Sequence, residues 1–179
     1  MIKLITELPS SFLKNSMKSQ AILSNKSPQI GKRHLEVMDE LESMLDQGKS
    51  FSTMSDLAKK LKISLRTLYE IAPSKEELIV TTVDRVLKKH GKIATDAMNA
   101  HSSPIKKLES FLTVANQAVG PRFERFTLSL SSLNSSKPMV DYHEQYITDL
   151  IKNLLDEARI KNEIKEIDTQ ATALLLGGL

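Results

Sequence analysis

The segment 53–78 contains residues that begin and end helices at short intervals. Thr53, Ser64 and Ser74 carry short hydroxyl side chains, which accept hydrogen bonds from the free backbone N–H groups at helix N-termini. Pro73 has no backbone N–H and disfavours helix in the residue before it, so the helix after Ser64 is expected to end there. The spacing therefore predicts two short helices, a tight turn and a third helix, as in a helix-turn-helix. A helical hairpin that serves only as core is the alternative.

Basic side chains gather around the predicted turn, at Lys59, Lys60, Lys62 and Arg66. Phosphate contacts from Lys and Arg supply most non-specific affinity for DNA. In a helix-turn-helix, the first residues of the second helix face base edges in the major groove. Arg66 stands at that place, and its guanidinium can pair with both acceptors of guanine. For the lysines, an ordinary solvated face is the alternative interpretation.

The same segment resembles the helix-turn-helix of the tetracycline-repressor (TetR) family. The matching residues are Thr53, Asp56, Ala58, Ser64, Thr67-Leu68-Tyr69 and Ser74-Lys75-Glu76-Glu77-Leu78. The resemblance is specific from about residue 29 to residue 90 and generic beyond. It implies an all-helical, dimeric protein with an N-terminal DNA-binding domain. The C-terminal domain would bind a small molecule and mediate dimerisation. The helix that connects the two domains would couple ligand binding to the distance between the two DNA-binding domains of the dimer.

The family pattern also implies which side chains contact DNA. The residues implied to contact phosphates are Thr53, Ser64, Tyr69 and Lys75, and those implied to face bases are Leu65, Arg66 and Thr67. Some positions depart from the pattern: Lys62, and the run Glu70-Ile71-Ala72, where the family commonly has a neutral or basic residue followed by two aromatics. Lys62 stands where the family usually has glycine, because the turn favours a positive φ, so a non-glycine residue there carries strain. Glu70 would repel a phosphate placed close to it.

The composition excludes several classes of protein. The chain has 179 residues, 40% hydrophobic and 26% charged, which suits a globular protein of one or two domains. Cysteine is absent, so disulfides, thiolate metal sites and cysteine nucleophiles are excluded. No run reaches the roughly 18 apolar residues of a membrane span. Glu7 and Pro9 interrupt the first apolar stretch, which makes it a poor signal peptide. We expect a cytoplasmic protein without a membrane partner.

The net charge of +3 is unevenly distributed along the chain. Residues 1–28 hold four Lys and one Glu, a balance of +3. Residues 29–92 have a balance of +2, and residues 93–179 have a balance of −2. A basic front and an acidic back suit a protein that offers one end to nucleic acid.

Three parts follow from these patterns: a flexible basic arm over 1–28, a helix-turn-helix DNA-binding domain over 29–73, and a helical ligand-binding and dimerisation domain over 74–179. The arm either reaches a DNA groove or is a leader without a role.

The first helix is expected to start at Pro28, with Ser27 as its cap, and to end at Gly48. His34 should lie at the edge of the first domain's core, and Phe51 should fill that core.

After Pro73, the connecting helix is expected to run to His90-Gly91. The later helices are expected at about 92–100, 104–119, 121–134, 138–161 and 167–179, and one of their breaks falls at Gly120-Pro121. The last of these helices is apolar nearly all round, so it must be covered by the core or by another subunit. We expect it to form a dimer interface, and we expect the protein to continue beyond Leu179.

No catalytic motif is recognisable in the sequence. Gly-rich phosphate loops, His-Glu-x-x-His and Gly-x-Ser-x-Gly are absent. The histidines are too scattered to form a metal site, so we expect no enzyme, no metal and no cofactor. Aromatic and polar residues of the C-terminal domain are candidates for lining a ligand cavity, although core or surface positions are more common for such residues. These candidates are Phe111, Phe123, Phe126, Tyr142, His143 and Tyr146.

The sequence thus predicts a dimeric transcriptional regulator, a repressor that a small-molecule effector releases from a palindromic double-stranded DNA operator. The alternative is a helical ligand-binding or protein-interaction module that has lost specific DNA recognition.

Overall fold

The computed structural model describes residues 31–49 and 52–178. The predicted arm over 1–28, with the Ser27 and Pro28 cap, lies outside the described residues, as do Phe51 and Leu179. The described residues form helices and connecting turns, with no strand among them. The predicted all-α class is therefore confirmed.

Four helix segments share the first core: α2 (Lys32–Asp46), α3 (Met54–Lys60), α4 (Leu65–Ile71) and the start of α5 (Lys75–Met98). Leu41, Leu57, Leu68 and Leu78, one from each helix, are almost completely buried there. The helix predicted to start at Pro28 begins at Lys32 instead, because the N-cap is Gly31, which has extended backbone. Each helix contributes a leucine to one cluster, so this unit has a core of its own.

The three predicted hydroxyl caps are confirmed. Thr53 Oγ1 accepts from the backbone N–H of Asp56 at 3.0 Å, and Ser64 Oγ accepts from Thr67 at 3.1 Å. Ser74 Oγ accepts from the backbone N–H of Glu77 at 3.1 Å. The starts of α3, α4 and α5 are therefore encoded locally.

Lys62 adopts the left-handed backbone predicted for it, with φ of 52°. It follows the C-cap of α3, where the backbone N–H of Ile63 bonds back to the carbonyl of Ala58 at 3.0 Å. Such a left-handed residue closes a helix C-terminus and costs a non-glycine side chain about 1–2 kcal/mol. The tight turn between α3 and α4 is held in this strained form.

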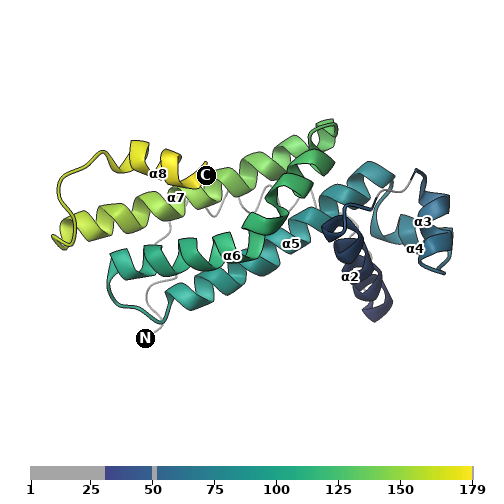
Figure 1. Ribbon diagram of the computed structural model, residues 1–179, viewed down its shortest axis with the longest axis horizontal. Coiled ribbons are helices and arrows are strands. Elements are labelled where there is room, and N and C mark those ends of the chain that lie inside the picture. Colours follow the sequence, from purple (N-terminus) through teal and green to yellow (C-terminus); the bar gives the residue numbers. More distant parts are fainter. Residues whose placement is uncertain (1–30, 50–51, 179) are drawn as a thin grey trace.

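Two predicted helix breaks are wrong. α5 continues through Gly91, and α6 (Pro104–Leu130) continues through Gly120-Pro121. Glycine inside a helix costs only about 0.5–1 kcal/mol, which the burial of Ala94 and Met98 beyond Gly91 offsets. Proline inside a helix removes one backbone hydrogen bond and kinks the helix where packing on both sides keeps it continuous. Figure 1 shows α6 changing direction near its middle.

The C-terminal helices run side by side. α5 packs against α6, α6 against α7 (Lys137–Ile160), and α7 against α8 (Thr169–Gly177). A short 3-10 turn, η1 (Asn134–Ser136), joins α6 to α7. In Figure 1, α2, α3 and α4 lie at one end of the elongated molecule, and α5 runs from them towards the other end. In the described part of the chain, no helix is long and apolar enough to cross a membrane.

Candidate nucleic-acid interface

The outward face of α4 carries two of the three predicted base-facing residues, Leu65 and Arg66, and the predicted phosphate contact Tyr69, whereas Thr67 is half-buried. Leu65 is 40% exposed and Tyr69 52% exposed, whereas Leu68 between them is fully buried. The side chain of Arg66 is 87% exposed. Leu68 faces the core, whereas the exposure of Leu65, Arg66 and Tyr69 directs these side chains away from it.

Basic residues lie beside this face. Lys59, Lys60 and Lys62 are all exposed at the end of α3 and in the turn. Lys75, at the start of α5, donates from Nζ to the carbonyl of Ser52 at 3.4 Å. It therefore ties α5 to the loop before α3.

The predicted hydroxyl contacts already have partners within the protein. Thr53 Oγ1 donates to Asp56 Oδ2 at 2.8 Å while it caps α3. The hydroxyls of Ser64 and Thr67 share a hydrogen bond of 2.8 Å. These hydroxyl groups stabilise the starts of α3 and α4.

Arg66 is engaged by Glu70, one turn further along α4. Arg66 Nε donates to Glu70 Oε1 at 2.9 Å, and the other carboxylate oxygen lies 3.2 Å from His34 Nε2. The Arg66 guanidinium, and next the His34 ring, hold the pKa of Glu70 below its usual value. The carboxylate is therefore ionised at neutral pH and bonded on both sides. The sequence alone predicted only that Glu70 would repel a phosphate.

His34 connects this pair to α2. Its side chain is 15% exposed, at the edge of the core as predicted. Nδ1 lies 3.2 Å from the backbone nitrogen of Gly31, which must be the donor. The proton of the neutral ring is therefore on Nε2, which donates it to Glu70. The spacing of Arg66 and Glu70 in the sequence suits a helical pair, but no local signal joins either of them to His34.

A second polar cluster lies where α2 meets α5 and α6. Glu42 of α2 is 8% exposed and lies 3.2 Å from Arg122 Nη1 of α6. Arg85 and Lys89 of α5 approach its other oxygen at 3.8 and 3.7 Å. Arg122 also pairs with Asp46 at 3.0 Å. An acidic face of α2 thus meets basic side chains from both neighbouring helices, an arrangement that sequence reasoning missed.

His90 of α5 borders this polar cluster. Arg122 Nη1 donates to His90 Nε2 at 3.1 Å, so the imidazole must be neutral to accept the bond. Burial, and next the positive charge of Arg122, lower the pKa of His90. Protonation of His90 would place a second positive charge against the guanidinium.

The six predicted ligand-lining residues do not share one location. Phe111 is buried in a cluster with residues of α5, α7 and α8, and Phe126 is buried in a different cluster with Val83 and Val86. Phe123, Tyr142 and Tyr146 are exposed. His143 Nε2 lies 2.9 Å from Asp84 Oδ1 and joins α7 to α5.

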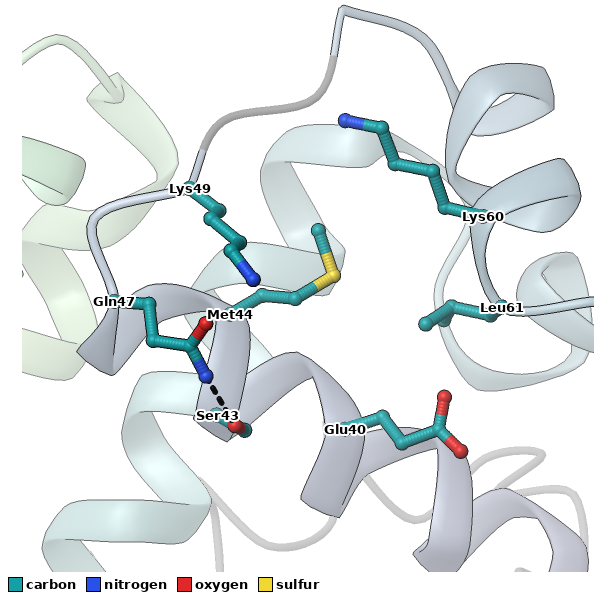
Figure 2. Close-up of a pocket in the computed structure, with 7 residues that line it drawn as sticks. All are labelled: Glu40, Ser43, Met44, Gln47, Lys49, Lys60 and Leu61. Atoms are coloured by element: carbon teal, nitrogen blue, oxygen red, sulfur yellow. Dashed lines mark hydrogen bonds between the residues drawn. The ribbon is translucent and has the colours of Figure 1, made fainter.

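Among the cavities of the described residues, two lie open at the surface. One, of about 560 Å³, lies between the end of α2 and the end of α3, where Figure 2 shows Met44 and Lys49 extending towards Lys60 and Leu61. The other, of about 430 Å³, lies between α7 and α8 and includes Thr148. Neither is lined by a predicted ligand residue, so that assignment stays a prediction.

No group of three or more potential metal ligands occurs among residues 31–49 and 52–178. Comparisons with models of protein families, with curated proteins and with solved structures found no significant match.

Proposed function

We propose that this protein is a sequence-specific DNA-binding transcriptional regulator in which α3, the turn and α4 act as a helix-turn-helix. The observation that carries the proposal is the exposed Arg66 on α4. Its Nη1 and Nη2 groups make no hydrogen bond within the described residues and lie in the first turn of the helix. In a helix-turn-helix, this part of the second helix enters the major groove.

The charge around α4 supports the same proposal. Lys59, Lys60 and Lys62 are exposed beside the first turn of α4, where they could reach the phosphates that flank the groove. Tyr69 is exposed one turn after Leu65 and offers a phenolic hydroxyl to the backbone of the DNA. Base contacts from α4 would supply the sequence preference, and the lysines most of the affinity.

We further propose a homodimer that binds a palindromic operator through two reading helices about 34–36 Å apart. Leu174 and Leu175 of α8 are 57% and 71% exposed, which suits a surface covered by a second subunit. A small-molecule effector of the C-terminal helices would favour a spacing that no longer fits the operator, and would thus release the repressor. If the effector moved α6, the Glu42–Arg122 contact would transmit that movement to α2.

Arg66→Ala tests the proposal, and Arg159→Ala is its matched control. Both arginines pair with a glutamate, but Arg159 has a half-exposed side chain, lies at the end of α7 and bonds Glu166 at 2.6 Å. Arg66→Ala should weaken binding to a selected operator by about tenfold or more, since it removes a bidentate base contact. Arg159→Ala should bind like the original protein. Equal affinity in both variants would show that Arg66 does not read a base.

The second candidate function is a helical ligand-binding or protein-interaction module without specific DNA recognition. The observation that favours it is the Glu70 carboxylate, which partly neutralises the one arginine of α4. Salt separates the two functions: DNA binding weakens steeply as salt rises, whereas an apolar protein interface hardly responds.

A further inference from the structure

Glu70 is anchored more firmly than an ordinary surface partner of an arginine. An exposed pair one helical turn apart is weak by itself, because two long side chains must be ordered together. In this protein the second oxygen of Glu70 accepts from His34 Nε2 at 3.2 Å, and the His34 side chain is itself 15% exposed. The backbone N–H of Gly31 donates to Nδ1, the other nitrogen of the ring. The Glu70 carboxylate is therefore held in place by a contact that does not depend on Arg66.

The hydrogen bond to Glu70 determines which nitrogens of the Arg66 guanidinium remain available to contact DNA. Arg66 uses Nε for Glu70, and its two terminal nitrogens have no hydrogen bond within the described residues. Those two nitrogens present parallel N–H donors on the outer edge of the plane. Guanine presents two acceptors, O6 and N7, at matching spacing in the major groove. An arginine whose Nε is bonded within the protein is thus suited to pair with guanine through its two terminal nitrogens.

Glu70 also restricts the conformations that the Arg66 side chain can adopt. An unrestrained arginine on an exposed helix can swing to the nearest phosphate, a contact that carries no sequence information. The bond to Glu70 opposes that movement, and the negative charge itself disfavours phosphates nearby. Removing Glu70 should therefore change specificity and non-specific affinity in opposite directions.

We propose that Glu70, held by His34, is a positioning residue that fixes Arg66 for one guanine in each half of the operator. This inference rests on the proposed DNA-binding function. It assigns to Glu70 a role in specificity, and to His34 a supporting role in keeping the carboxylate in place.

The test compares binding of the original protein and Glu70→Ala to three duplexes at fixed salt. These are the selected operator, the operator with the assigned guanines replaced by adenines, and a random duplex. Glu36→Ala is the matched control, because Glu36 pairs with Arg33 at 3.0 Å on α2 and has no contact with Arg66. The original protein should prefer the guanine operator by about tenfold or more. Glu70→Ala should lose most of that preference and bind the random duplex more tightly, and Glu36→Ala should keep the preference. His34→Phe should lie between Glu70→Ala and the original protein.

A second measurement examines the pair without DNA. The Nε–Hε resonance of Arg66, identified by its loss in Arg66→Lys, should be observed at neutral pH, since a hydrogen-bonded proton exchanges slowly. In Glu70→Ala it should broaden or vanish. An unchanged resonance would show that Glu70 does not hold the guanidinium.

The outcomes separate this inference from the proposed function. If the original protein selects an operator and Glu70→Ala keeps the full preference at every position, the role of Glu70 is refuted and the regulator stands. If the original protein selects no sequence at any salt concentration, the proposed function fails, and the guanine contact fails with it.

Discussion

Arg122 of α6 donates a hydrogen bond to Glu42 of α2 at 3.2 Å, although the two residues lie 80 positions apart in the sequence. The contact joins the unit that contains α3 and α4 to the C-terminal helices. Burying charged groups is costly unless they are paired, so we expect this cluster to fix the orientation of α2 more than to add stability.

Glu42→Ala should lower the free energy of unfolding by about 1–3 kcal/mol. Removing one member of a buried pair leaves the others uncompensated, and partial exposure of Arg85 and Arg122 reduces the full effect of about 3–5 kcal/mol. Urea unfolding measures the change. Glu40→Ala is the control, because Glu40 is exposed on the same helix, and it should stay within about 0.5 kcal/mol of the original protein. Equal stability of the two variants would contradict the structural role of the cluster.

The stability of the protein should fall as the pH drops below about 6.5, the ordinary pKa of histidine. The pKa of His90 is lower in the folded protein, so in this range the unfolded chain binds a proton that the folded protein does not. This contribution is fully present above the ordinary pKa and is lost as pH falls towards the folded value. The free energy of unfolding, measured in urea between pH 5 and 8, should depend less steeply on pH in His90→Gln than in the original protein. His101→Gln, at an exposed position, should keep the original slope. Parallel curves for the original protein and His90→Gln would refute the coupling.

Lys62→Gly should stabilise the protein by roughly 0.5–1 kcal/mol, since glycine tolerates the φ of 52° that strains lysine. The greater freedom of glycine in the unfolded chain keeps the gain small. Thermal unfolding measures it. Lys60→Gly, in the helical backbone of α3, should instead destabilise by up to about 1 kcal/mol. A loss of stability in Lys62→Gly would mean that the lysine side chain contributes more than its strain costs.

Ser64 allows capping to be separated from DNA binding. Ser64→Ala should cost about 1 kcal/mol of stability, because the cap at the start of α4 is lost. Ser64→Asp should keep the cap and the stability, but its negative charge should weaken binding to every duplex. The measurements are thermal unfolding and DNA affinity on both variants. If Ser64→Asp bound DNA normally, the start of α4 would not lie near a phosphate.

The local features of the fold were predictable from the sequence, and the long-range contacts were not. Thr53, Ser64 and Ser74 cap helices because their hydroxyls act within three residues. Gly91 failed as a helix end because packing on both sides outweighs a small local cost.

The polar contacts of the candidate site depend on the tertiary fold. His34 and Glu70 meet across 36 positions, and a pattern read along one helix carries no signal for that contact. The exposed face of α4 was predictable, but the anchoring of Arg66 on that face was not.

The most direct test of the proposed function is selection of bound duplexes from a random double-stranded DNA library with the purified protein at moderate salt. The proposal predicts recovery of an inverted repeat whose half-sites lie about one helical turn apart, or a multiple of it, each with a guanine that Arg66→Ala no longer prefers. Recovery of no common sequence from a protein that is folded and dimeric would contradict it, and would favour the interaction module.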